Sequence, residues 1–302
     1  MCHALPQGWR GLTRAYLQLA LSMSLVGANV AVAKILADSL PIAMIACLRC
    51  AIAVVVLVPL ARIFDPPVRP SAASLRNLAW QALFGTALYN AGLLAGLRLT
   101  TALEAGLVLA TLPAVVAIGG AVWLRERMPA RQWLAVMIAA TAMAALTLAR
   151  LTPDAAGSAL GNALVFAGIC GEAMYVLLGK RLGNALPVLT ASLWMQVFST
   201  LILLPFTLAE LPAMAALAEP HLAGLLLFHS LTASVLCLLL WYAGLKRVPA
   251  GMAGVFTAFL PATAAVVAIL VLGETPTLVH GVGFALMLAS VFLATWHRKV
   301  AA

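Results

Sequence analysis

Apolar runs of about 20 residues follow one another along almost the whole chain, which is 302 residues long. Only helices and closed barrels satisfy their backbone groups inside a bilayer, and these runs lack the alternating pattern of barrel strands. The sequence therefore predicts an all-α polytopic membrane protein. We place its ten spans near residues 14–34, 41–61, 77–97, 103–124, 131–149, 158–179, 188–209, 222–245, 251–272 and 278–297.

Charged residues make up only 9% of the chain, whereas a soluble surface carries charge at roughly a quarter or more of its positions. The basic residues lie between the spans and not in one patch, which excludes a nucleic-acid interface. With a cytoplasmic N-terminus most of the 18 Lys and Arg residues fall on the inner side, as the positive-inside rule requires. We expect a multi-pass protein of the bacterial inner membrane with both termini in the cytoplasm.

The second half of the sequence repeats the first. At an offset of 148 residues, Ala95-Gly96-Leu97-Arg98 matches Ala243-Gly244-Leu245-Lys246 and Leu112-Pro113-Ala114 matches Leu260-Pro261-Ala262; upstream the offset is 146, as between Pro41 and Pro187. The repeats cover residues 14–150 and 158–298, with five predicted spans each. Because five is odd, the second repeat is predicted to be inverted relative to the first. Two inverted halves can expose a site between them to either side in turn, which favours a transporter.

These matched segments resemble the drug/metabolite transporter superfamily, in its branch of ten helices with two duplicated five-helix units. The resemblance rests on the two Leu-Pro-Ala segments, on Glu126 and Glu274 after them, and on Pro41 with Arg49. Within that branch the chain is most similar to bacterial aromatic amino acid exporters of the YddG type. The resemblance implies a central cavity formed chiefly by spans one, three, four, six, eight and nine, and export of amino acids or related metabolites.

Two prolines and two charges lie inside the predicted spans. Pro113 and Pro261 remove a backbone hydrogen bond near the middle of spans four and nine, so they predict kinks that serve either gating or packing. Glu172 is the one carboxylate near the middle of a span, where a charge is costly. It is expected to bind a substrate ammonium or exchange a proton at a cavity, or to form a structural pair. Arg49 is interpreted first as the partner in a structural or gating pair, if spans two and six approach, and otherwise as a group that binds a substrate carboxylate.

Polar and aromatic residues near the middle of several spans suit a pocket for a zwitterion with a large side chain. Each of them alone also fits a contact between helices. The predicted substrate-binding residues are Asn29, Tyr89, Asn90, Thr111, Glu172, Tyr175, His229, Phe256 and Thr257. His229 is either a proton carrier or a packed neutral imidazole. Trp241 is either an interfacial anchor or a gate at the inner mouth.

Other positions have expected structural roles. Glu126 and Glu274 each end a span and are expected to cap the helix that follows. Lys180 ends span six and is expected to reach the membrane interface. The Gly92-x-x-x-Gly96 spacing allows a close approach between helix backbones.

The sequence contains no P-loop, no His-Glu-x-x-His segment and no recognisable catalytic pair. We therefore expect no enzyme activity, no cofactor and no metal, and the five cysteines are predicted to be buried thiols. The predicted protein is a monomer that binds the lipid bilayer and a small-molecule substrate. It exports amino acids, with aromatic and other large apolar ones favoured, by alternating access. The alternatives are proton-coupled efflux of lipophilic cationic drugs and a passive channel for small solutes.

Overall fold

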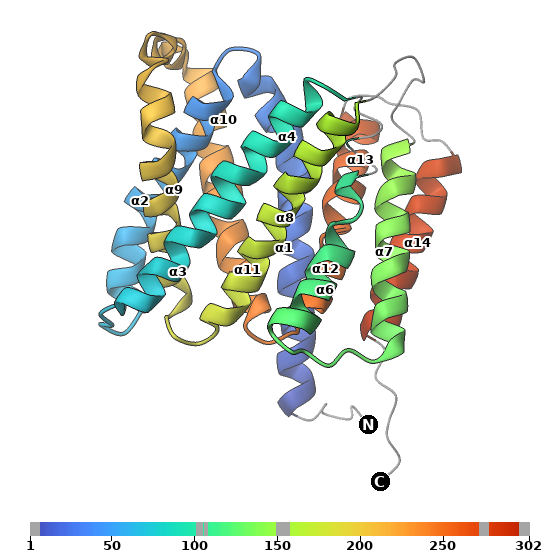
Figure 1. The fold of residues 1–302 in the computed structure, drawn as a ribbon. Coiled ribbons are helices and arrows are strands. Elements are labelled where there is room, and N and C mark those ends of the chain that lie inside the picture. The colour runs from blue at the N-terminus through green and yellow to red at the C-terminus, as the bar shows by residue number, and fades with distance from the viewer. Residues whose placement is uncertain (1–6, 101–104, 106–107, 149–157, 272–277, 296–302) are drawn as a thin grey trace, which may run out of the picture.

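A computed structural model describes residues 7–100, 105, 108–148, 158–271 and 278–295, which form a bundle of helices (Figure 1). The described helices of the first half are α1 (Gln7–Ala37), α2 (Ile42–Phe64), α3 (Ala72–Ala82), η1 (Leu83–Leu88), α4 (Tyr89–Leu97), α6 (Leu112–Trp123) and α7 (Ala130–Leu148). Those of the second half are α8 (Ala159–Leu182), α9 (Val188–Leu208), η2 (Leu211–Ala218), α10 (Pro220–His229), η3 (Ser230–Leu236), α11 (Cys237–Leu245), α12 (Ala250–Phe256), α13 (Phe259–Val271) and α14 (Leu278–Thr295).

Five helices in the described ranges are long and apolar enough to cross a bilayer. They run over Gly11–Ala37, Ile42–Phe64, Ala159–Leu182, Val188–Leu208 and Pro220–Leu245, and shorter apolar helices accompany them. The all-helical fold is therefore confirmed for the described residues, and its long apolar helices fit a membrane protein, while the count of ten spans stays a prediction. The start of α1 and the end of α14 lie at the same edge of the bundle (Figure 1).

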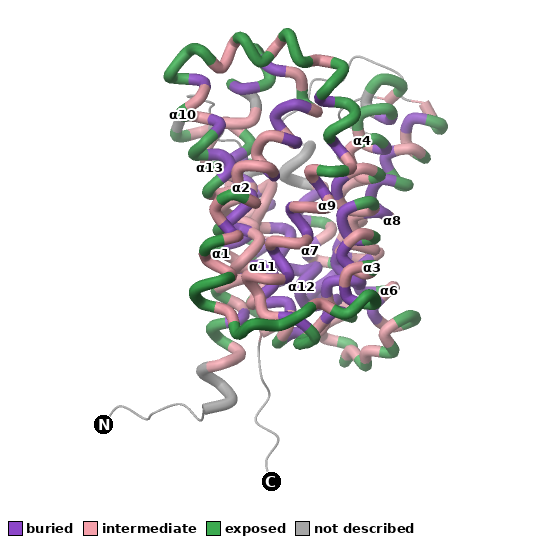
Figure 2. The backbone as a smooth tube through the Cα atoms, turned by 90° about the vertical axis from the view of Figure 1, so that its left-hand side faces the viewer, coloured by how far each residue is buried: buried purple, intermediate pink, exposed green. Residues whose placement is uncertain are grey.

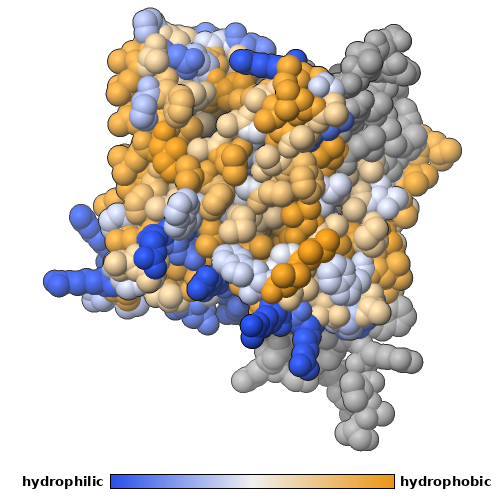
Figure 3. Space-filling model, viewed as in Figure 1, coloured by the Kyte–Doolittle hydropathy of each residue, from blue (hydrophilic) through white to orange (hydrophobic). Residues whose placement is uncertain are grey.

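The outer surface of the bundle is apolar. Buried residues follow the middle of the bundle in Figure 2, whereas its outer turns and both edges are exposed. On the face drawn in Figure 3 an apolar band lies between hydrophilic side chains at the upper and lower edges. Large apolar side chains stand outside the core, such as Val55 at 73% exposed and Leu270 at 77%. Such a band fits a protein surrounded by lipid.

Most helix packing joins one half of the chain to the other. α2 packs along α9, α7 along α14, and α6 against α12. α1 lies against α11 and α13, and α4 lies against α8. If the repeat carries α1 onto α8 and α4 onto α11, the contact between α1 and α11 becomes the contact between α8 and α4. The packing therefore has the pairing that a two-fold repeat requires.

Matched glycines make this equivalence visible at atomic detail. A methyl group on Gly96 would lie 2.7 Å from the carbonyl oxygen of Gly161, and one on Gly244 would lie 3.0 Å from that of Ala15. Gly244 is the repeat equivalent of Gly96, and Gly161 is that of Ala15. Gly92 similarly lies against α8 at Gly168. The close approach predicted from the Gly92 and Gly96 spacing is confirmed.

Two pairs of helices depart from ideal α geometry at equivalent positions. The π-helical segments η1 and η3 interrupt the third and eighth predicted spans, and residues 83–88 correspond to 231–236. The helices that hold Pro113 and Pro261 are broken just before these prolines, at residues 110–111 and 257–258. A proline cannot donate to the carbonyl four residues earlier, which explains both breaks. The predicted kinks are confirmed, while a gating role for them stays a prediction.

Candidate functional site

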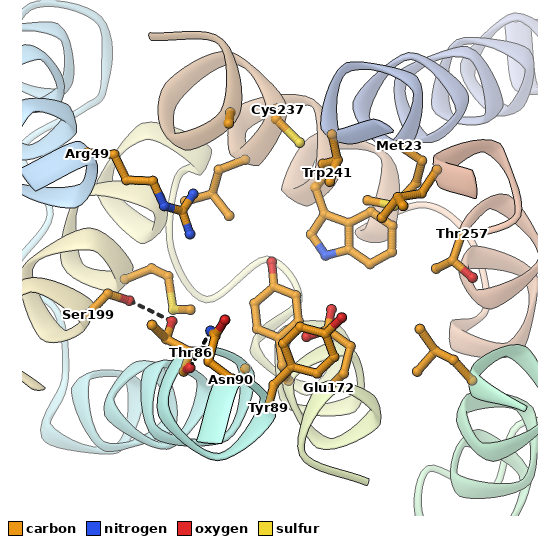
Figure 4. Close-up of a pocket in the computed structure, with 18 of the residues that line it drawn as sticks. Met23, Arg49, Thr86, Tyr89, Asn90, Glu172, Ser199, Cys237, Trp241 and Thr257 are labelled. Atoms are coloured by element: carbon orange, nitrogen blue, oxygen red, sulfur yellow. Dashed lines mark hydrogen bonds between the residues drawn. The ribbon is translucent and has the colours of Figure 1, made fainter. Parts of the chain in front are cut away.

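A cavity of about 400 Å³ lies inside the bundle, where the two π-helical segments and the broken helix α12–α13 meet. Its walls come from α1, α2, η1, α4, α6, α7, α8, α9, η3, α11 and α13. Eight residues predicted from the sequence line it: the binding candidates Tyr89, Asn90, Glu172, Tyr175 and Thr257, and the gating or structural candidates Arg49, Trp241 and Pro261. Figure 4 shows how several of these side chains surround the open space.

The charged residues Arg49 and Glu172 stand on different walls of the cavity (Figure 4). Arg49 donates from Nη1 to the Ser234 hydroxyl at 3.1 Å. Within the described part of the chain no ion pair joins Arg49 to Glu172. The predicted pair is therefore not formed in this structure, where α2 packs along α9 and η3 and not along α8, and a gating pair stays a prediction. Both charges are left facing the cavity.

A polar wall lies on the Arg49 side of the cavity. The Thr86 hydroxyl of η1 lies 3.1 Å from the Ser199 hydroxyl of α9, and the Asn90 amide donates to the Thr86 carbonyl at 2.6 Å. Gln196 donates to the Ser234 carbonyl at 2.5 Å. Gln196 and Ser199 were not predicted from the sequence. Their spacing of three residues on one helix face was the available signal, since polar side chains in a span favour its protein-facing side.

Aromatic side chains form the walls near Glu172. Tyr89 and Tyr175 line the cavity together with Glu172, and Figure 4 shows Trp241 across the space from Tyr89. Trp241 is 2% exposed, so its predicted role as an interfacial anchor is wrong. In the described structure its indole nitrogen has no hydrogen-bond partner, and Figure 4 shows this atom facing the space between the two charges. A buried donor without a partner is costly and fits a site that a ligand completes.

Four predicted binding residues do not line this cavity. Asn29 accepts from the Thr232 hydroxyl at 3.0 Å and lies 2.9 Å from Nδ1 of His229, so these three side chains satisfy one another. Thr111 donates to the Val108 carbonyl at 2.7 Å. The fourth, Phe256, lies in the packed core. Asn29, His229 and Thr232 hold α1 against α10 and η3, which was the simpler of the two interpretations open from the sequence. The Thr111 bond is local to its own segment.

Phe256 belongs to the packed core beneath the cavity. It is 1% exposed, and its ring stacks on Tyr16 at 5.5 Å and on Phe259 at 6.1 Å between centroids. Pro113, predicted to shape the site, is buried where α6 meets Gly254 of α12 and does not line the cavity. A ring packed on two sides has no free face for a substrate.

Glu126 and Lys180 hold the corner between α11 and α12. The first amide of α12, at Ala250, donates to Oε2 of Glu126 at 2.8 Å. Lys180 donates from Nζ to the carbonyl oxygens of Leu245 at 3.3 Å and Val248 at 2.5 Å. An acid at a helix start and a base at a helix end both oppose the helix dipole.

The capping prediction for Glu126 is thus right in kind, but the capped helix is α12 of the other half and not the next helix, α7. Lys180 likewise binds carbonyl oxygens where we expected it to reach the membrane interface. Glu274 lies outside the described residues. The sequence predicted that Glu126 would bind a helix end, but it did not predict that both Glu126 and Lys180 would bind the corner between α11 and α12. That contact depends on how the two halves of the chain pack together.

Replacing Glu126 separates its capping role from its charge. Glu126→Ala is expected to lower stability by about 1 kcal/mol, because it removes the acceptor for the α12 amide, whereas Glu126→Gln keeps that acceptor. Burial raises the pKa of the Glu126 carboxyl, although the Ala250 amide and the Lys180 charge act to lower it. The folded state therefore holds this proton longer than the unfolded state does, and this contribution to stability falls as pH rises between the two pKa values.

This expectation is checked by melting wild type and both variants in detergent at several pH values. The contribution of residue 126 to the pH dependence of the melting temperature should vanish in Glu126→Gln. Equal melting temperatures for Glu126→Ala and wild type would contradict the capping role.

Comparison with known proteins places this geometry in a family. The model of the EamA-like transporter family matches twice, over residues 13–148 and 159–296. The chain belongs to the EamA-like transporter family. The two matched ranges divide the transporter where the sequence repeat does, and they agree with its assignment to the drug/metabolite transporter superfamily and with a role other than that of an enzyme.

The names of the relatives of this EamA-like transporter specify a transporter but no substrate. It is 31% identical over 289 residues to the uncharacterized transporter YetK of Bacillus subtilis (strain 168), covering 94% of this chain and 88% of that protein. It is 26% identical over 229 residues to an uncharacterized transporter of Archaeoglobus fulgidus, covering 75% of this chain and 78% of the relative. A solved crystal structure aligns with a TM-score of 0.74 at 16% identity, over 94% of this chain and 96% of its own. That structural likeness shows the fold alone.

Within the described residues, no cluster of three or more His, Cys, Asp or Glu side chains has an arrangement suited to a metal ion. The four described cysteines are free thiols, and Cys47, Cys50 and Cys237 are buried. The side chains that line the cavity offer charge, hydrogen bonding and aromatic contact.

Proposed function

We propose that this transporter exports zwitterionic amino acids with aromatic or other large apolar side chains across the bacterial inner membrane. The observation that carries the proposal is a cavity with one unpaired base, Arg49, and one unpaired acid, Glu172, on different walls. An amino acid has a carboxylate that can bind Arg49 and an ammonium that can bind Glu172. A cavity of about 400 Å³ lies within the usual size range for small-molecule sites.

The remaining walls support a large apolar side chain. Tyr89, Tyr175 and Trp241 supply aromatic surface, and the unpartnered indole N–H of Trp241 adds a donor for the substrate carboxylate. When an amino acid is bound, its carboxylate would compensate the charge of Arg49 and its ammonium that of Glu172. Without substrate, both charges stay uncompensated. This matters because an uncompensated charge is costly away from water.

In this proposal the chain crosses the membrane ten times, with both termini in the cytoplasm, and works as a monomer. Residues 14–150 and 158–298 are inverted repeats that move relative to each other, so that the cavity opens to each side in turn. The matched helix breaks before Pro113 and Pro261 and the matched π-helical segments are the positions at which the helices would bend.

Efflux of lipophilic cations is a second candidate, because aromatic rings stand beside the Glu172 carboxylate. Rings and a carboxylate attract a cation without any need for Arg49. The two candidates therefore differ in their demand for a substrate carboxylate. Proton exchange at Glu172 is compatible with either of them.

Transport by purified protein in liposomes tests the proposal. We expect saturable uptake of labelled phenylalanine that tryptophan and methionine compete and that a quaternary ammonium dye does not. Competition by the dye alone would favour cation efflux, and flux without saturation or counterflow would favour a channel. Unchanged transport and pH dependence in Glu172→Gln would remove both the ammonium and the proton role from that residue.

A further inference from the structure

A second hollow of about 400 Å³ lies at the edge of the bundle where α3 begins and where α6 and α8 end. It has no lining residue in common with the central cavity. The groups that give it polarity are Arg76, Asn77 and Arg181, and the aromatic ones are Trp80, Phe84 and Trp123. Figure 3 shows hydrophilic side chains gathered at this lower edge, below the apolar band. The hollow therefore spans the border between the hydrophilic edge and the apolar band.

The polar part of the hollow is suited to an anion. Arg181 lies over the ring of Trp123, 5.4 Å from its centroid, and none of the described residues that line the hollow is acidic. In the described structure Arg76 and Arg181 form no ion pair, and both are exposed. Asn77 accepts from Gln81 through Oδ1 at 2.6 Å, which leaves its amide hydrogens to donate. Two guanidinium groups and an amide are the donors that bind phosphate oxygens.

The other part of the hollow is suited to hydrocarbon. Phe84, Met174 and Leu178 line it on the side towards the apolar band. Trp80 stacks on Phe84 at 5.6 Å between centroids and is 46% exposed. Tryptophan and arginine at the end of an apolar surface are typical of the level of lipid headgroups. A soluble anion would contact only the basic groups, whereas a lipid would cover the apolar wall as well.

The repeat provides an internal comparison for this hollow. The equivalents of Arg76, Trp80 and Arg181 in the opposite half are Gly224, Phe228 and Ile35. The helix starts themselves correspond, since α3 follows Ser71 and α10 follows its equivalent, Glu219. The basic groups are therefore not part of the repeated framework and occur at one edge only. That is the edge where Arg62, Arg69 and Arg247 also lie, as expected for the side of the membrane that faces anionic lipids.

We propose that this hollow binds the phosphate headgroup of an anionic phospholipid. Arg76 and Arg181 hold the phosphate, Asn77 donates to it, and an acyl chain lies along Phe84, Met174 and Leu178. Gln81 donates to Oδ1 of Asn77 and accepts from the Tyr242 hydroxyl at 2.7 Å, so Gln81 connects the site to α11 in the interior. Lipid bound here would thus stabilise the contact between α3 and α11.

Thermal unfolding and native mass spectrometry of the full chain in detergent test the site. Phosphatidylglycerol is expected to raise the melting temperature and remain bound, whereas phosphatidylcholine and inorganic phosphate at the same concentration do neither. In Arg76→Gln/Arg181→Gln the affinity for phosphatidylglycerol should fall about 30-fold, from the loss of two basic groups at a membrane surface. Arg62→Gln/Arg69→Gln is the matched control, because it removes the same charge from exposed residues outside the hollow.

Three results would overturn the proposal. Equal stabilisation by phosphatidylcholine would mean that charge is not recognised, and equal stabilisation by inorganic phosphate would assign the site to a soluble anion. The same loss of affinity in the control double variant would mean that net charge alone attracts the lipid. Arg181→Lys adds a geometric readout, since it keeps the charge but loses the planar group that stacks on Trp123. It should lower affinity less than the double variant does.

Discussion

Arg49→Gln is expected to remove the transporter's preference for ligands that carry a carboxylate. Truncating one member of a buried charge pair costs about 2 kcal/mol or more, so the affinity for phenylalanine should fall at least about 30-fold. The affinity for phenylalaninamide, which has no carboxylate, should hardly change. Equilibrium binding to the purified protein, followed by thermal shift, gives the ratio of the two affinities directly.

Glu172→Gln is the reciprocal experiment. It should lower the affinity for phenylalanine by a similar factor. The affinity for 3-phenylpropionate, which has no ammonium, should hardly change. Arg62→Gln and Glu219→Gln are matched controls, because each removes the same charge from an exposed residue outside the cavity. Both should bind all these ligands as wild type does.

The pattern across the two variants separates the candidate functions. If the site binds zwitterions, Arg49→Gln should lose only the preference for a ligand carboxylate, and Glu172→Gln should lose only the preference for a ligand ammonium. A site for lipophilic cations predicts that Glu172→Gln abolishes binding of a quaternary ammonium dye and that Arg49→Gln strengthens it, since a repelling charge is removed. If neither variant changed any affinity ratio, the central cavity would not be the substrate site.

Local sequence determined much of the fold. Continuous apolar runs predicted the helices because a backbone in lipid must satisfy its own hydrogen bonds. Pro113 and Pro261 predicted two helix breaks, since the lost hydrogen bond lies within four residues of the proline. The matched π-helical segments η1 and η3 were not predicted. They have no proline or glycine pattern in common and depend on the packing of α8, α9 and α2 around them.

The candidate site was harder to predict than the fold, for a physical reason. A helix in lipid is apolar on all sides, so hydrophobic periodicity does not tell which face looks into the protein. Asn29 and His229 therefore had the same signal as Tyr89 and Asn90, although they bond to each other and do not line the cavity. Arg49 and Glu172 were identified because charge inside a span is rare, but whether they pair depended on the arrangement of helices.

Gly27→Ala is expected to cause a large loss of stability in this chain. A methyl group on Gly27 of α1 would overlap the backbone carbonyl oxygen of Leu260 and lie 3.0 Å from Cβ of Thr263 in α13. A backbone oxygen within a helix moves only if the helix moves, so α1 and α13 must separate. Overpacking of this kind costs about 1–3 kcal/mol. Melting in detergent measures it.

Gly224→Ala is the control for Gly27→Ala, because a methyl group on Gly224 would meet no atom of the described residues within 4 Å. It replaces the same residue type by the same residue in α10 and gains helix propensity, so it should melt at or above the wild-type temperature. Leu260 also lines the central cavity. Gly27→Ala is therefore expected to weaken phenylalanine binding as well as stability, whereas Gly224→Ala affects neither. Wild-type melting of Gly27→Ala would mean that α1 and α13 do not approach as closely as described.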